Sequence, residues 1–152
     1  MTKSPVSPWM KRAFAVTVFG LGLTGLAQMP IFSRYYIADI PGFGWLGDFV
    51  FTHTLHYALA AIFLFLAFFF AATFFLNRRP LTTLTASGAI RVALYTALIV
   101  TGAVRVVKNI SGVYLGETTV MLVDWSHLLV AVLLLLAVSW SRRTARKDFT
   151  TS

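Results

Sequence analysis

Four long apolar runs, separated by short polar segments, constrain the fold of this chain more than any other feature. They cover residues 14–29, 49–76, 86–107 and 120–140, and the second run contains no acidic residue, lysine or arginine. About 20 apolar residues suffice for a helix to cross a bilayer. The runs do not alternate between apolar and polar residues, which argues against a β-barrel. We therefore expect an all-α integral membrane protein, a four-helix bundle forming one domain over residues 1–152, with helices at about 12–29, 48–76, 86–107 and 120–140.

The composition supports a bilayer as the solvent. The chain is 58% hydrophobic and 12% charged, whereas about 25% charged residues is usual for a soluble domain. A soluble fold of 152 residues would leave too much apolar surface in water. The net charge of +8 would suggest nucleic-acid binding in a soluble protein, but the basic residues lie at the ends of the apolar runs and not along one face. No nucleic-acid partner is expected.

The distribution of charge predicts the orientation. The ends of the apolar runs that would lie on one side of the membrane are strongly basic. The ends on the other side carry few cations and most of the acidic residues. The positive-inside rule assigns the basic side to the cytoplasm. Both termini and the 78–85 turn are then cytoplasmic, and the 30–48 and 108–119 loops lie outside. The basic side contains Lys3, Lys11, Arg12, Arg78, Arg79, Arg142, Arg143, Arg146 and Lys147, with Arg91 close by, and the other side contains Arg34, Arg105, Lys108, Asp39, Asp48, Glu117 and Asp124.

The first apolar run has a second interpretation. A basic start followed by an apolar stretch also describes a secretory signal peptide. The residues that follow, Gln28-Met29-Pro30, do not form the small-x-small pattern of a cleavage site. A retained first helix is therefore the preferred prediction.

All three histidines lie inside the apolar runs: His53 and His56 in the second run and His127 in the fourth. An ionisable side chain within a membrane span is costly and marks a candidate functional site. At about 1.5 Å rise per residue, His56 and His127 both lie roughly two turns from the outer end of their helices. An imidazole from each of two helices can supply the two axial ligands of a haem iron, and such a site needs no cysteine, which this chain lacks.

Other interpretations of the histidines stay open. They can be ordinary buried side chains bonded to neighbouring groups, or zinc ligands with Asp124 as a third ligand. His53 and His56 are three residues apart and point about 60° apart on one helix, so either one is a candidate partner for His127. The depth match favours His56, which leaves His53 to bond a haem propionate or a quinone oxygen.

Two cations end the third run on the outer side. Arg105 and Lys108 are candidates to pair with haem propionates, although long basic side chains at a span end also simply reach for the interface. Arg34, Tyr35 and Tyr36 in the first outer loop are weaker candidates.

Short motifs carry a family resemblance over most of the chain. They are residues 23–26 (LTGL) before Pro30, residues 55–56 (LH), residues 101–102 (TG) and residues 126–128 (SHL). With these, the chain resembles the four-helix cytochrome b membrane subunits of formate dehydrogenase and nickel–iron hydrogenase. The resemblance implies that His56 and His127 bind a haem b near the outer face. It also implies a bacterial inner-membrane location and electron transfer between a periplasmic redox partner and the quinone pool.

The chain departs from this family at the cytoplasmic side. The family's second haem uses a histidine early in the first helix and another about fourteen residues beyond the first ligand of the fourth helix. Here Met10 and Lys11 lie in the first region, and residue 141 is a serine. The resemblance therefore implies one haem, with quinone exchange near the outer face and His53.

The expected role is a non-catalytic electron-transfer subunit of an oxidoreductase complex. The outer acids Asp39, Asp48, Glu117 and Asp124 offer a mildly acidic rim to a redox partner, or are simply solvated. A haem-free membrane anchor or assembly subunit is the main alternative. A small transporter or proton relay using the three histidines ranks last, because the spans contain no paired acids and no interruption.

Overall fold

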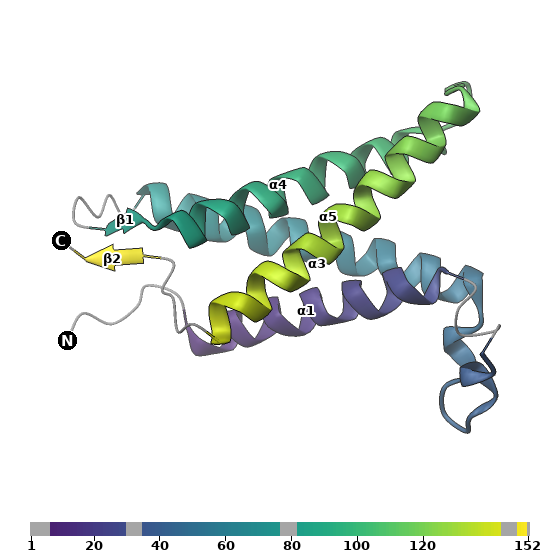
Figure 1. Ribbon diagram of the computed structural model, residues 1–152, viewed down its shortest axis with the longest axis horizontal. Helices are drawn as coiled ribbons and strands as arrows, with labels where there is room; N and C mark the ends of the chain where they lie inside the picture. Colours follow the sequence, from purple (N-terminus) through teal and green to yellow (C-terminus); the bar gives the residue numbers. More distant parts are fainter. Residues whose placement is uncertain (1–6, 30–34, 77–81, 144–148, 152) are drawn as a thin grey trace. The chain divides into compact units, whose positions relative to one another are not determined.

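Four helices dominate the computed structural model, which describes residues 7–29, 35–76, 82–143 and 149–151. Each is long and apolar enough to cross a membrane. The predicted all-α membrane fold is confirmed, and the strands add only three residues each. In chain order the elements are α1 (Pro8–Ala27), the 3-10 turns η1 (Ile37–Asp39) and η2 (Gly44–Leu46), α3 (Phe49–Leu76), β1 (Thr82–Leu84), α4 (Ala86–Val107), α5 (Glu117–Arg143) and β2 (Phe149–Thr151) (Figure 1).

Local capping explains where the helices start. α1 begins at Pro8, four residues before the predicted start, because the Ser7 hydroxyl accepts the Met10 N–H at 3.4 Å and proline is well suited to the first helical turn. Asp48 accepts the Phe51 N–H at 3.0 Å at the start of α3. Thr85 caps α4 by accepting the Gly88 N–H at 3.1 Å. Each cap satisfies a backbone donor that has no partner within the helix.

The fourth helix is also longer than predicted. α5 begins at Glu117, three residues before the predicted start, and ends at Arg143 instead of residue 140. Residues 117–119 were expected in the preceding loop because they are not apolar. An acid in the first turn is nevertheless favourable to a helix, because it faces the positive end of the helix dipole.

The chain divides into two compact units, Met1–Arg78 and Arg79–Ser152, each built on one helical hairpin. In the first unit, α1 packs along α3 (Figure 1). The Phe14 ring of α1 lies 5.6 Å from the Phe63 ring and 5.4 Å from the Phe70 ring of α3. Further along, Gly20 lets the two helices approach closely, since a Cβ there would lie 2.9 Å from a methyl of Leu59.

In the second unit, α4 packs along α5. At the end near β1, the Ser87 and Ser141 hydroxyls are hydrogen-bonded at 2.8 Å, and Ser141 is buried. The strands β1 and β2 pair antiparallel, with Thr83 opposite Thr150 (Figure 1). The Ser141 side chain therefore joins α4 and α5.

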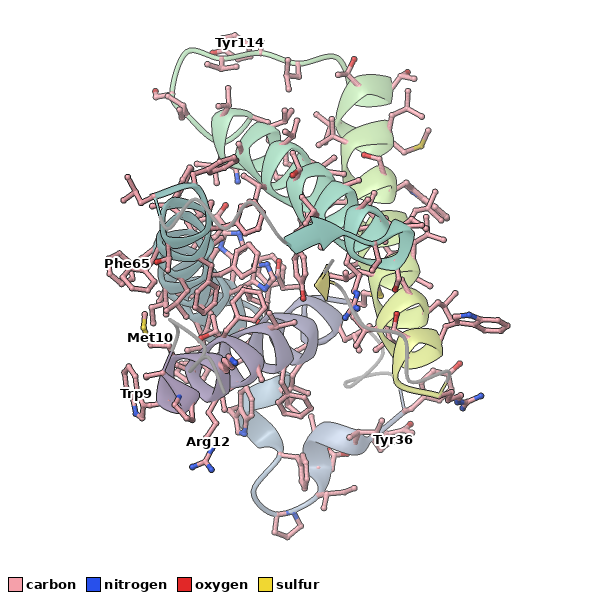
Figure 2. The ribbon with its side chains drawn as sticks, turned by 90° about the vertical axis from the view of Figure 1, so that its left-hand side faces the viewer. Trp9, Met10, Arg12, Tyr36, Phe65 and Tyr114 are labelled. Carbon is pink, nitrogen blue, oxygen red and sulfur yellow. The ribbon has the colours of Figure 1, made fainter. Side chains whose placement is uncertain are left out.

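Most of the apolar side chains on these helices are exposed. Phe65 is 67% exposed and Leu135 is 66% exposed, and Figure 2 shows Trp9, Phe65 and Tyr114 pointing outward. In none of the four candidate spans is more than 17% of the apolar window buried. Such surfaces are unfavourable in water and favourable in hydrocarbon. The chain thus has the helices of a multi-pass membrane protein in a lipid bilayer.

The predicted cytoplasmic location of both termini and the single four-helix domain stay predictions. Several residues used in the charge argument lie outside the described residues: Lys3, Arg34, Arg78, Arg79, Arg146 and Lys147.

Candidate functional site

His56 lies on α3 and contacts a threonine–glycine pair on α1. Its Nδ1 atom is 2.9 Å from the Thr24 hydroxyl oxygen, and Thr24 is only 1% exposed. The same hydroxyl lies 2.7 Å from the carbonyl oxygen of Gly20, one turn earlier on α1. The next residue, Gly25, faces the ring edge, because a Cβ there would lie 3.4 Å from His56 Cε1.

His127 lies on α5 and has the same kind of neighbours on α4. Its Nδ1 atom is 2.8 Å from the Thr101 hydroxyl oxygen. That hydroxyl lies 2.8 Å from the carbonyl oxygen of Ala97. A Cβ on Gly102 would lie 3.5 Å from His127 Cε1. The distances reproduce those of the first hairpin to within about 0.1 Å.

The chain therefore builds one arrangement twice. In each hairpin the first helix supplies a Thr-Gly pair and the second supplies a histidine, and we call each set of three residues a TGH cluster: Thr24, Gly25 and His56 in the first unit, and Thr101, Gly102 and His127 in the second. By their positions along the helices, both clusters lie nearer the loop of their hairpin than its open end. No single offset in the sequence relates the two clusters, because the Thr-Gly pairs lie 77 positions apart and the histidines 71 positions apart.

The similarity of the hairpins extends into their packing. Phe63 lies seven residues after His56, and Leu134 lies seven residues after His127. They are 7% and 6% exposed, so both belong to the small buried core of their helix pair. In each unit, the second helix thus carries a histidine and, two turns later, a buried apolar residue.

His53 has surroundings unlike those of the other two histidines. Its ring stacks against Phe49, with centroids 5.5 Å apart and planes at 16°. On its other side the Tyr57 ring centroid lies 4.3 Å away. These three aromatic rings follow one face of α3 at four-residue spacing. Thr24 and Gly25 of α1 instead contact His56, which distinguishes the surroundings of the two histidines.

Arg105 and Lys108 both bind one carboxylate. Arg105 Nε lies 2.8 Å from one Asp124 oxygen, and Lys108 Nζ lies 2.9 and 2.8 Å from the two oxygens. The group of two cations and one carboxylate has a formal charge of +1. It joins the end of α4 to the first turns of α5, and Asp124 lies three residues before His127. From the sequence, these cations were candidates to pair with haem propionates or to extend to the membrane interface, and their pairing with Asp124 was not predicted.

The weaker candidates are at the surface or outside the described part of the chain. Tyr35 and Tyr36 are 66% and 74% exposed, and Arg34 is not among the described residues. Of the predicted acidic rim, Asp48 caps α3 and Asp124 is in the ion pairs. Both acids therefore have partners within their own hairpin.

A zinc site receives no support. Among residues 7–29, 35–76, 82–143 and 149–151, no group of three or more histidine, cysteine, aspartate or glutamate side chains is placed to hold a metal ion. Zinc sites need three or four protein ligands. A haem needs only two, because the porphyrin supplies the other four nitrogens.

Comparisons with protein-family models, with curated proteins and with solved structures found no match for this chain. The likeness to cytochrome b subunits accordingly rests on the short motifs around the histidines. What the chain does has to be argued from the TGH clusters and the ion pairs beside them.

Proposed function

We propose that the chain is a membrane-anchored b-type cytochrome subunit. It exchanges electrons between a periplasmic redox partner and the quinone pool through one haem b, which His56 and His127 would hold. Catalysis on the partner's substrate belongs to the partner. A haem held in this way supplies a reversible one-electron couple.

The duplicated TGH cluster is the observation that carries this proposal. A haem held by two histidines would need two equivalent donors, and the chain supplies two histidines in matching surroundings. Helix packing alone does not require a histidine to recur with the same threonine and glycine neighbours in a second hairpin. His53, which lies three residues from His56, does not share these neighbours.

The donor set also fits a haem in its chemistry. Imidazole is a usual axial ligand of b-type haem iron, and helix bundles hold cofactors by side chains that project from facing helices. In each cluster the ring is fixed by a threonine on the neighbouring helix. Fixed orientation of the ligand side chain is what a metal site needs from its surroundings.

The net positive charge of Arg105, Lys108 and Asp124 at the end of α4 supports binding of the negatively charged haem propionates. Two cations share one carboxylate, and Arg105 has five N–H donors, of which the Nε–H is used on Asp124. Haem propionates are carboxylates that suit such donors. We assign the remaining donor capacity of this group to them.

One haem is the expected content. The first helix contains no histidine, and Ser141 is buried against Ser87. Electron exchange with quinone therefore belongs near the outer face, where Phe49 and Tyr57 beside His53 offer aromatic contacts to a quinone head group.

The main alternative is a haem-free membrane anchor or assembly subunit. The Thr–His hydrogen bonds favour it to a degree, since they satisfy the imidazole Nδ1 atoms within each hairpin without any cofactor. A proton relay or transporter based on the histidines is a third candidate. Haem content separates the first function from both others.

The test is a visible spectrum of the detergent-purified chain with haem quantified per polypeptide. A reduced-minus-oxidised b-type spectrum with one haem per chain is the expected result. Two haems would mean that ligands outside His56 and His127 hold a second group. No haem, after expression with haem supplied, would leave the structural anchor as the better account.

We propose a bacterial inner-membrane location with both termini in the cytoplasm, following the charge distribution. The chain has no cysteine, so single-cysteine variants report orientation directly. Tyr114, 94% exposed in the α4–α5 loop, and Ser7, exposed before α1, are suitable positions. We expect a membrane-impermeant maleimide to label Tyr114→Cys in spheroplasts and to label Ser7→Cys only after lysis. The reverse pattern would contradict the orientation.

A further inference from the structure

We propose that Thr24 and Thr101 are positioning residues that set the tautomer of the two histidines. Each threonine accepts a hydrogen bond from the histidine Nδ1–H, so that the Nε2 atom carries the lone pair offered to the iron. The role of these threonines in haem binding rests on the proposed function. The histidine tautomers themselves are a property of the chain without haem.

The argument counts protons on the threonine hydroxyls. A hydroxyl has one proton to donate and two lone pairs to accept with. The Thr24 oxygen lies 2.7 Å from the Gly20 carbonyl and the Thr101 oxygen lies 2.8 Å from the Ala97 carbonyl. Both distances are at the preferred value for O–H···O bonds. A threonine hydroxyl within a helix commonly donates to the backbone carbonyl one turn earlier.

A hydroxyl that donates to its own helix has only lone pairs left for the histidine. The Nδ1 atoms at 2.9 and 2.8 Å must then carry the proton. The hydrogen bond made by one ring nitrogen determines which nitrogen is available to a metal. The ring of each histidine is thus held in the form that coordinates through Nε2.

Burial makes the preference strong at Thr24. Thr24 is 1% exposed and lies between two apolar helices, so water does not compete for its hydroxyl. An N–H or O–H group without a partner in such a place is costly. Within a low-dielectric membrane helix pair, the whole chain of carbonyl, hydroxyl and imidazole is expected to keep one direction of donation.

The glycines complete the positioning. Gly25 and Gly102 follow the threonines and lie against the Cε1 edge of each ring. The threonine holds Nδ1 while the glycine leaves room for the carbon between the two nitrogens. Together they fix both the tautomer and the position of the ring with one pair of adjacent residues.

The test is ring ¹⁵N NMR of the full chain, prepared without haem and labelled on its three histidines. We expect Nδ1–H and an unprotonated Nε2 for His56 and His127. Thr24→Val should disturb the His56 signals alone, and Thr101→Val those of His127 alone. Thr24→Ser and Thr101→Ser should restore them, because serine keeps the acceptor. Thr96→Val is the matched control, since the Thr96 hydroxyl also bonds the carbonyl one turn earlier on α4, at 2.9 Å.

Haem-loaded protein gives the second readout. Thr24→Val and Thr101→Val should each lower haem affinity by about 10-fold or more, as loss of a ligand's hydrogen-bond partner typically does. The haem midpoint potential should become more positive, because an imidazole that no longer donates its N–H is a weaker electron donor. The serine variants should stay near wild type in both measurements.

The two proposals fail in different ways. If His56 and His127 carry the proton on Nε2 in the haem-free chain, the threonines do not set the tautomer, whatever the haem content. If the tautomers are as expected and the chain binds no haem, the tautomer assignment stands and the cytochrome function is wrong. If the serine variants changed the histidine signals as much as the valine variants, the threonines would serve packing alone. The same would follow if the Thr96→Val control changed them equally.

Discussion

Replacing His56 or His127 with alanine is expected to abolish the b-type spectrum. Each change removes one of the two histidines that would hold the haem in the proposed function. Loss of an outer hydrogen-bond partner alone typically costs about 10- to 100-fold in metal affinity, and loss of the ligand itself should exceed this. Haem per chain, measured on detergent-purified protein after matched expression, is the quantity to compare.

His53→Ala is the matched control for His56→Ala. The two residues lie three positions apart on α3 and both are half-buried, so a general effect on the helix would appear in both variants. His53 stacks between Phe49 and Tyr57 and lies outside the TGH clusters. We expect one haem per chain to be retained in this variant. A variant series in which His53→Ala loses the haem and His56→Ala keeps it would reverse the assignment of the ligand on α3.

The helices were predictable because the bilayer imposes a simple rule on them. A continuous apolar run of sufficient length identifies a spanning helix without knowledge of its neighbours. The errors fell at the helix ends, where apolarity is a poor guide. α1 starts at Pro8 because of the Ser7 cap, and α5 starts at Glu117 in a polar turn. Both features are local and polar, and a search for apolar residues passes over them.

The site was predictable only in part, for a different reason. An ionisable residue in a span is conspicuous on its own, which identifies the histidines. Its hydrogen-bond partner is not conspicuous, since Thr24 precedes His56 by 32 residues and lies on another helix. Finding it requires knowing which faces of α1 and α3 meet. The motif around Thr24-Gly25 was noted as a family resemblance, but its contact with the imidazole becomes visible only in the hairpin.

The ion pairs illustrate the same point with charge. Arg105 and Lys108 were correctly placed at the end of α4, near the first turns of the next helix. From the sequence they have two candidate roles, which are pairing with a cofactor carboxylate and extending to the membrane interface. The geometry gives both of them Asp124. A prediction from spacing alone cannot separate the two, because helix α5 brings Asp124 back to α4 only after the hairpin closes.

A leucine at Gly25 is expected to expel the haem, although an alanine there is tolerated. An alanine Cβ would lie 3.4 Å from His56 Cε1, close to ordinary contact, whereas the longer branched side chain of leucine would have to enter the space of the imidazole ring. Overpacking of this kind typically costs about 1–3 kcal/mol, and the ring would be displaced from the Thr24 hydroxyl. Gly102→Leu should do the same to His127, where the Cβ distance is 3.5 Å.

Gly22→Leu tests whether the effect belongs to the ring contact. Gly22 lies on α1, three residues before Gly25, and a Cβ there would meet no atom within 4 Å. The two leucines have the same helix propensity and the same hydrophobicity, so a difference between them reports on position alone. We expect Gly22→Leu to keep one haem per chain and Gly25→Leu to lose most of it, with Gly25→Ala close to wild type. Equal haem loss in Gly22→Leu and Gly25→Leu would show that α1 tolerates no bulk at all, and the glycine would then serve the helix pair and not the imidazole.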